Sequence, residues 1–258
     1  MSARSFGVSL RTSVAKSIPA HAGTVPTSAS PSAAARVRDA AVQALSWLIP
    51  VDCAGCGQPD SPLCEQCERA LRSGGVRHRT LGEFAVVSAM DYVGPVVGVM
   101  RSLKAEGRTG LARPLGAALR GAMEGTNTVA GGLVPAIAAG AVIPVAIPSS
   151  SAALRRRGYG VVELIVREAG LHCLPALRSV GSGVDQRALG RAARERNTQG
   201  MFAVRSVPLR PVVLIDDVVT TGATLRAATD ALRAAGATVI GAVTVASTPL
   251  LWSRDTQG

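Results

Sequence analysis

Two adjacent acids and a hydroxyl-rich turn form the stretch of the sequence best suited to chemistry. The segment 212–224 reads VVLIDDVVTTGAT. Its first four residues, Val212 to Ile215, predict a strand buried on both faces of a sheet. Asp216 and Asp217 follow at the carboxyl end of that strand, where open α/β sheets bind their ligands. The turn then leads into a helix through Thr220, Thr221, Gly222, Ala223 and Thr224.

The residue types of this segment fit a sugar phosphate. Backbone N–H groups and hydroxyls at the start of a helix bind anions, and Gly222 lets the backbone approach a phosphate closely. Asp216 and Asp217 can accept hydrogen bonds from vicinal ribose hydroxyls, directly or through a divalent ion. The alternative is that Asp217 and the threonines only cap a helix. Two acids between an apolar strand and a T-T-G-x-T turn favour the phosphate and ribose interpretation.

Four cysteines form a second cluster, Cys53, Cys56, Cys64 and Cys67. Two Cys-x-x-Cys pairs can supply four thiolates in a tetrahedron, as in a closed structural zinc site. The alternatives are two disulfides or a redox Cys-x-x-Cys pair. No signal peptide is apparent, which argues against disulfides, and four cysteines exceed what redox chemistry needs. We therefore predict bound Zn²⁺, with Cys173 as an ordinary core residue.

Two arginine-containing segments lie between these clusters. Ser149–Tyr159 follows an apolar, proline-containing strand, and its Arg155, Arg157 and Gly158 are candidates for binding a pyrophosphate. The alternative for this run is a solvated basic helix face. Arginines recur between residues 187 and 196 in a segment that could close over an anionic substrate or contact nucleic-acid phosphates.

The apolar pattern indicates the elements that position these residues. Short apolar runs predict strands at 84–90, 141–146, 212–215 and 238–245, and helical spacing predicts helices at 36–48, 93–106, 111–123, 160–169 and 223–235. A helical turn through Leu71 follows the cysteines. The alternation of strands and helices favours an α/β fold with a parallel sheet flanked by helices.

Composition limits the classes of function. Apolar residues make up 47% of the 258 residues and aromatic residues 3%, so the core must consist mainly of aliphatic side chains. The net charge of +11 favours anionic partners. No run of about 18 apolar residues predicts a membrane span, and no G-x-x-x-x-G-K-[ST] loop predicts an ATP-driven motor. We expect a cytoplasmic protein without membrane insertion.

We expect four parts along the chain. Residues 1–35 are rich in Ser, Ala, Thr and Pro and predict a disordered extension, with an organelle transit peptide as the alternative. Residues 36–75 would form a helix and the four-cysteine module, 84–248 the α/β domain and 249–258 a tail.

The segment 212–224 resembles the PRPP-binding motif of type I phosphoribosyltransferases. That resemblance implies the type I phosphoribosyltransferase fold. It assigns the ribose to Asp216 and Asp217 and the 5′-phosphate to the loop of Thr220, Thr221, Gly222, Ala223 and Thr224. It also implies Mg²⁺ as the cofactor that accompanies PRPP.

The order of all the motifs resembles the ComF family of competence-associated proteins. The matching features are the four cysteines, the R-x-R-G-aromatic segment, a Q-x-x-L…R-x-x-N-x-x-G-x-F stretch and the PRPP motif, within residues 51–247. The resemblance makes Arg194 and Asn197 candidates for a flexible loop. The sequence departs from the family at Gly160-Val161, where Asn-Gln is usual.

Two functions follow from these resemblances. The first is an enzyme that transfers phosphoribosyl from PRPP, or a related nucleotide-sugar phosphate, to an unidentified acceptor. The second is a non-catalytic accessory protein in DNA uptake that binds single-stranded DNA or a DNA-uptake helicase. Few aromatic residues are present for base stacking, and the sequence predicts neither the acceptor nor the oligomeric state.

Overall fold

The computed structural model describes residues 51–126, 129, 131–180 and 200–249. Contacts divide the chain into Met1–Ile49 and Pro50–Gly258, and every described residue belongs to the second unit. The predicted extension 1–35, the predicted helix 36–48, the arginines between 187 and 196 and the tail from residue 250 lie outside the described residues.

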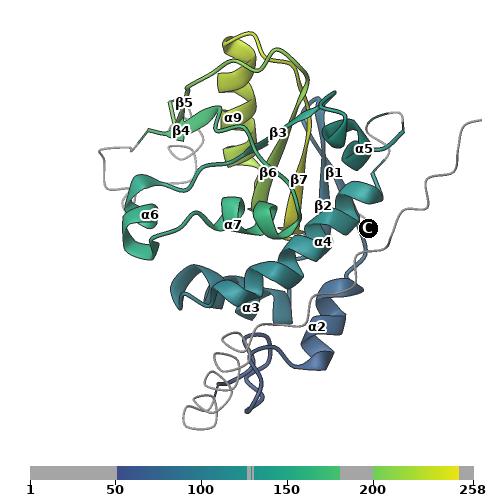
Figure 1. The fold of residues 1–258 in the computed structure, drawn as a ribbon, viewed down its shortest axis with the longest axis vertical. Coiled ribbons are helices and arrows are strands. Elements are labelled where there is room, and N and C mark those ends of the chain that lie inside the picture. The colour runs from purple at the N-terminus through teal and green to yellow at the C-terminus, as the bar shows by residue number, and fades with distance from the viewer. Residues whose placement is uncertain (1–50, 127–128, 130, 181–199, 250–258) are drawn as a thin grey trace, which may run out of the picture. The chain divides into compact units, whose positions relative to one another are not determined.

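A five-stranded sheet organises the described residues, in the order β1-β2-β7-β6-β3 (Figure 1). Strands β2, β7, β6 and β3 are parallel, and β1 is antiparallel to β2 at one edge. The strands are β1 (Arg77–Leu81), β2 (Phe84–Asp91), β3 (Ile143–Ala146), β6 (Val212–Val219) and β7 (Val239–Ser247). The predicted α/β fold with a mostly parallel sheet is confirmed.

Helices cover both faces of this sheet (Figure 1). They are α2 (Glu65–Arg72), α3 (Pro95–Ala105), the 3-10 turn η1 (Thr109–Leu111), α4 (Ala112–Glu124), α5 (Leu133–Ala138), α6 (Ser151–Arg157), α7 (Val161–Glu168) and α9 (Ala223–Ala234). Buried residues of α3, α4 and α7 pack with Val213, Ile215 and Val243 of the sheet. The opposite sheet face, with Val212 and Leu214, packs against α9.

Most predicted elements occur, with shifted ends and several additions. The strand expected at 212–215 continues to Val219, because parallel pairing with β7 extends past both acids. The additional elements are β1, α5, α6 and a separate antiparallel pair, β4 (Leu177–Ser179) with β5 (Phe202–Val204). They are short and lack a strong apolar period, so the pattern alone does not distinguish them from loops.

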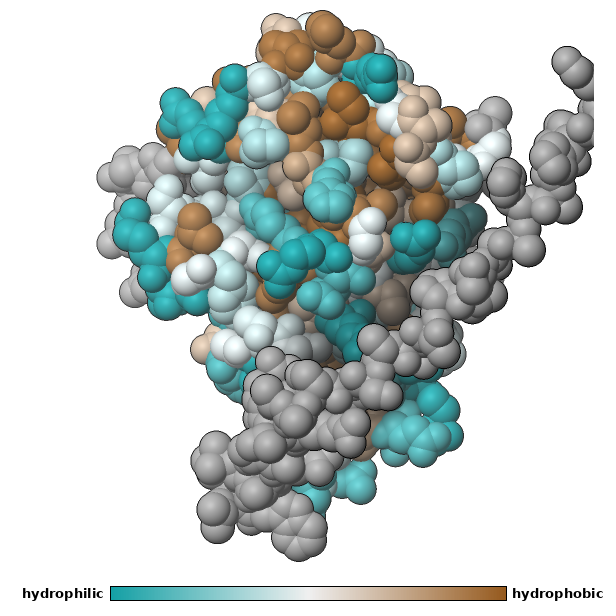
Figure 2. All heavy atoms as spheres, viewed as in Figure 1, coloured by the Kyte–Doolittle hydropathy of each residue, from teal (hydrophilic) through white to brown (hydrophobic). Residues whose placement is uncertain are grey.

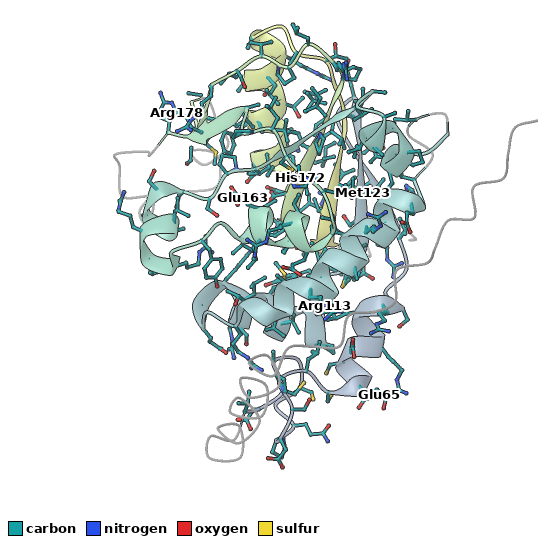
Figure 3. The ribbon with its side chains drawn as sticks, viewed as in Figure 1. Glu65, Arg113, Met123, Glu163, His172 and Arg178 are labelled. Atoms are coloured by element: carbon teal, nitrogen blue, oxygen red, sulfur yellow. The ribbon has the colours of Figure 1, made fainter. Side chains whose placement is uncertain are left out.

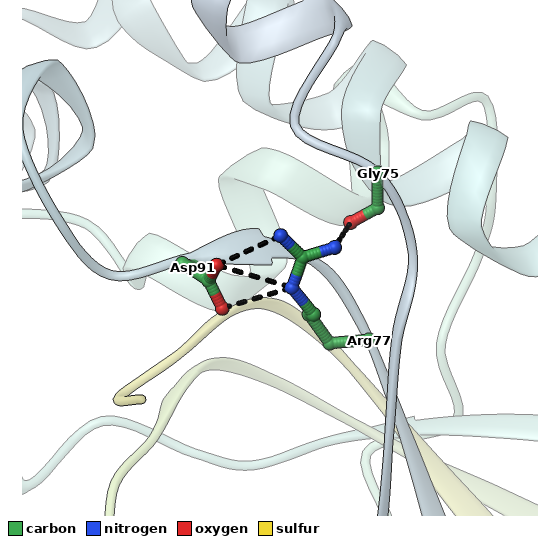
Figure 4. Close-up of polar contacts among 3 residues, drawn as sticks. All are labelled: Gly75, Arg77 and Asp91. Atoms are coloured by element: carbon green, nitrogen blue, oxygen red, sulfur yellow. Dashed lines mark hydrogen bonds and ion pairs between the residues drawn. The ribbon is translucent and has the colours of Figure 1, made fainter. Parts of the chain in front are cut away.

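Arg77 links the antiparallel edge strand β1 to the end of β2. Its guanidinium donates to both carboxylate oxygens of Asp91 at 2.8–3.1 Å and to the Gly75 carbonyl at 3.2 Å (Figure 4). Asp91 ends β2 and Gly75 precedes β1. One side chain therefore ties the end of a sheet strand to the turn that enters its antiparallel neighbour.

The face drawn in Figure 2 is divided between hydrophobic and hydrophilic residues. Hydrophobic side chains gather over its upper half, and hydrophilic ones predominate below. Within the described residues, no helix is long and apolar enough to cross a membrane.

Candidate substrate site

The two predicted acids lie on β6 and point to opposite faces of the sheet, because successive side chains of a strand alternate. By this alternation Asp216 shares its side of the strand with Val212 and Leu214. It lies in register with Thr244 of β7, which in turn pairs with Ser88 of β2. Asp217 follows Ile215 toward the face of α3 and α7.

Asp216 is buried, with 8% of its surface exposed. Its Oδ1 accepts a hydrogen bond from the Asp217 N–H at 2.8 Å. Burial, followed by the charge of Asp217, raises the pKa of Asp216 to about 8, against the opposing effects of that N–H and of Lys104. Burial therefore favours the protonated form of Asp216 over a pH range in which an ordinary aspartate is ionised.

Asp217 forms an ion pair that the sequence motifs do not predict. Its Oδ2 lies 2.9 Å from the Nζ of Lys104, in the last turn of α3. The side chains are 16% and 35% exposed, respectively. In the sequence, Lys104 is separated from Asp217 by more than 100 residues, so no local motif connects the two.

The predicted phosphate loop turns from β6 into α9. Gly222 precedes the helix with φ 78°, and a Cβ there would lie 2.2 Å from Cδ1 of Leu81. Glycine is therefore required both by the backbone conformation and by the approach of β1. Thr221 Oγ1 accepts from the Ala223 N–H at 3.3 Å, and the Thr220 carbonyl accepts from Arg79.

The start of α9 is capped by a side chain and also has groups that can bind an anion. Thr221 satisfies one N–H at the start of α9, as the capping interpretation expects. The N–H groups of the next residues have no intrahelical acceptor, as in any first helical turn, and the helix dipole favours a negative group there. Thr220 and Thr221 are exposed and can donate to a phosphate.

The predicted pyrophosphate segment forms α6 and the turn after it. Ser150 caps α6 by accepting from the Ala153 N–H, and Gly158 ends the helix in a left-handed conformation. Arg155 is exposed. Arg157 turns inward and donates to Ser149 Oγ at 3.2 Å, while its buried Nε has no hydrogen-bond partner in the described structure.

Glu163 lies in the first turn of α7 (Figure 3), where the charges of Arg157 and Asp217 act on its carboxyl group. Burial raises the pKa of its carboxyl, its own N–H and Arg157 lower it, and the charge of Asp217 raises it further. A Cβ at Gly160 would lie 2.0 Å from Glu163 Oε2. The Glu163 carboxylate therefore occupies the space that a side chain at residue 160 would take.

The four cysteines meet in a second site. Their sulfur atoms all lie within 4.8 Å of one another, and Cys56 and Cys64 are 3.7 Å apart. Sulfurs bound tetrahedrally at about 2.3 Å from Zn²⁺ lie roughly 3.8 Å apart, so the cluster fits that ion. None of the cysteines is in a disulfide.

Backbone N–H groups favour the thiolate form of one cysteine in this cluster, Cys53. Burial alone would raise the pKa of Cys53, but hydrogen bonds from the backbone of Cys64, Cys56 and Gly55 outweigh it and lower the pKa to about 6. The Cys64 N–H lies 3.3 Å from the Cys53 sulfur. A thiolate is the form that binds a metal.

The segment of the chain that contains both acids and the phosphate loop is similar to a known domain family. Residues 188–256 match the phosphoribosyl transferase domain family. The match supports a phosphoribosyltransferase-like protein. Lys104, Arg157 and the cysteines lie outside it, and the assignment to ComF stays a prediction.

One solved structure is similar over part of the chain. A hypoxanthine phosphoribosyltransferase from Staphylococcus aureus is 17% identical and covers 59% of this chain and 70% of its own, with a TM-score of 0.30. No curated protein matches the chain.

The structure brings some predicted residues together and leaves others apart. Asp217, Lys104, Glu163 and Arg157 interact in one cluster beside the end of β6. Arg194 and Asn197, the flexible-loop candidates, lie outside the described residues. In the sequence they lie between β4 and β5. Next to these two paired strands, the Val180 N–H donates a hydrogen bond to the Met201 carbonyl at 2.8 Å.

Proposed function

We propose that this protein binds PRPP together with Mg²⁺ at the end of β6 and transfers its phosphoribosyl group to an acceptor. One observation carries the proposal: two acids in the C-terminal half of a parallel strand are followed by a Thr/Gly loop that leads into α9, within the region matched by the phosphoribosyl transferase domain. Asp216 and Asp217 would bind the ribose hydroxyls. The loop 220–224 would hold the 5′-phosphate.

The proposed reaction needs few proton transfers from the protein. A nucleophile attacks C1 of the ribose, the bond from C1 to the pyrophosphate oxygen breaks, and pyrophosphate leaves with that electron pair. Positive charge develops on the sugar, and the protein's task is to stabilise both charges. Asp217 faces the sugar with its carboxylate, and Arg157 is a candidate for the leaving group.

Mg²⁺ fits the donor set on chemical grounds. Carboxylate oxygens such as those of Asp217 are the ligands that this ion accepts, and it commonly keeps waters and substrate phosphates in its shell. When bound, the ion would neutralise charge on the pyrophosphate.

The ComF resemblance carries a second candidate, a role in competence and DNA uptake, with single-stranded DNA or a DNA-uptake helicase as partner. The four-cysteine module favours it, because the resemblance places such a module before the phosphoribosyltransferase-like domain. This role is compatible with PRPP binding without turnover. A cytoplasmic location accords with both candidates.

Calorimetric titration with PRPP, with and without Mg²⁺, tests the proposal. We expect Mg²⁺-dependent binding by the wild type and a loss of affinity of at least about 100-fold in Asp216→Asn/Asp217→Asn, because the two main ribose acceptors are removed. Asp230→Asn changes an exposed acid of α9 and should bind like the wild type. Pyrophosphate release during a screen of nucleobases would then identify an enzyme.

Two results would contradict the proposal. A folded wild type that binds no PRPP with Mg²⁺ would exclude the site, and unchanged affinity in the double variant would place it elsewhere. Binding without pyrophosphate release for any acceptor would leave the accessory role as the better description.

A further inference from the structure

Lys104 lies outside the region matched by the phosphoribosyl transferase domain. Its Nζ is 2.9 Å from Asp217 Oδ2. In the free protein, the acid proposed for ribose binding is therefore already paired with a cation from a helix near the start of the described chain.

The last turn of α3 is held beside the candidate pyrophosphate segment. The hydroxyl of Tyr159 donates to the carbonyl of Leu103, the residue before Lys104. Tyr159 directly follows the Arg157-Gly158 pair that ends α6. The base of the Lys104 side chain is thus fixed between the end of β6 and the segment with Arg157.

Charge in this cluster is balanced before a ligand arrives. Asp217 and Glu163 are opposed by Lys104 and Arg157, and the buried Asp216 completes the set of ionisable groups. A ligand that takes the Asp217 carboxylate for its hydroxyls, or for an accompanying divalent ion, leaves the ammonium of Lys104 without its partner. A second anionic group on that ligand can restore the balance.

We propose that Lys104 binds the diphosphate group of the substrate once the ribose hydroxyls engage Asp217. This inference rests on the proposed function. In PRPP the diphosphate is attached to C1, next to the carbon that carries the 2-hydroxyl, whereas the 5′-phosphate is at the other end of the sugar. A cation beside the ribose acid is therefore within reach of the diphosphate.

The existing ion pair is weak enough to be exchanged. The Lys104 side chain is 35% exposed, and solvent screens such pairs so that they contribute little to stability. A diphosphate carries more negative charge than one carboxylate, and a lysine ammonium on its four-carbon stem can reorient without movement of α3.

Comparison of two ligands separates this role from a purely structural one. PRPP and ribose 5-phosphate differ by the diphosphate alone. With Mg²⁺ present, we expect Lys104→Met to weaken PRPP binding about 10-fold or more, the effect of losing one charge-assisted contact. The affinity for ribose 5-phosphate should not fall, because removal of Lys104 frees Asp217. Lys104→Arg should restore most of the PRPP affinity.

Arg101→Met is the matched control, because it removes an exposed charge from the same helix. It should leave both affinities unchanged. If Lys104→Met lowered the affinity for both ligands equally, Lys104 would act only through Asp217. If it changed neither affinity, Lys104 would not contact the ligand. Either result overturns the inference while PRPP binding by the wild type stands. A wild type that binds neither ligand would instead refute the proposed function.

Discussion

At the residue scale, the two adjacent acids differ because the strand alternates. Asp216 is buried, and this burial, followed by the charge of Asp217, raises its pKa to about 8. Asp217 reaches the other face, remains partly exposed and pairs with Lys104. The two carboxyl groups therefore have different surroundings, although the sequence presents them as an equivalent pair.

The state of Asp216 predicts a pH dependence of stability. Its folded-state pKa of about 8 exceeds the value of about 3.9 in an unfolded chain. The folded protein therefore keeps a proton that the unfolded chain releases. The stability linked to this group is fully present below about pH 4 and is lost as pH rises through about 8.

Urea denaturation of the wild type and Asp216→Asn measures this effect. We expect the unfolding free energy of the wild type, relative to the variant, to fall by at least about 1.4 kcal/mol between pH 5 and pH 8, the equivalent of one pKa unit. Asp230→Asn, which alters an exposed acid of α9, should track the wild type. A constant difference across this range would show that Asp216 is ionised at neutral pH.

At the scale of elements, α3 connects the two candidate sites. Its last turn presents Lys104 to Asp217. Nearer its start, Gly98 lies against the cysteine module, where an added Cβ would be 2.2 Å from the Ala54 carbonyl oxygen. Val99, Met100 and Leu103 between them are buried in the core. The helix is therefore held by the module, the core and the acid.

Gly98→Ala tests this close contact. Alanine favours a helix over glycine by about 0.5–1 kcal/mol, but here its Cβ would collide with the backbone of Ala54. We expect a net loss of about 1–3 kcal/mol in unfolding free energy by urea denaturation, the usual cost of overpacking.

Gly121→Ala in α4 is the control, because a Cβ at Gly121 meets nothing within 4 Å. The same substitution should stabilise the protein there by roughly 0.5–1 kcal/mol. Stabilisation at both positions would mean that the cysteine module can shift away from α3 without a loss of unfolding free energy.

At the scale of the whole molecule, the proposed substrate site draws on distant parts of the chain. The acids and the phosphate loop come from the region that matches the phosphoribosyl transferase domain. Lys104 comes from α3 and Arg157 from α6. A structural metal that holds the cysteine module against α3 would therefore stabilise more than the module itself.

Metal removal tests that expectation. We expect about one zinc ion per chain by elemental analysis, the capacity of a four-thiolate site. Chelation, or Cys67→Ser, should lower the midpoint of thermal unfolding by at least about 4 °C, because structural zinc contributes directly to folding. Cys173→Ala removes the cysteine outside the cluster and should retain the metal. A metal-free chain with an unchanged midpoint would argue against a structural zinc site.

The sequence by itself determined the features that depend on near neighbours. Apolar runs and their spacing predicted β2, β3, β7 and the helices α3, α4, α7 and α9, because burial imposes those periods locally. The short motif of two acids and a Thr/Gly turn predicted a turn from a strand into a helix, which the structure forms between β6 and α9. The spacing of four cysteines predicted their clustering.

Only the tertiary structure decided which distant side chains meet. Strand pairing with β7 carried β6 past Ile215 to Val219 and so sent the two acids to opposite faces. The packing of α3 brought Lys104 to Asp217, and α7 placed Glu163 over Gly160. These contacts join residues far apart in the chain or depend on register, and no local pattern specifies either.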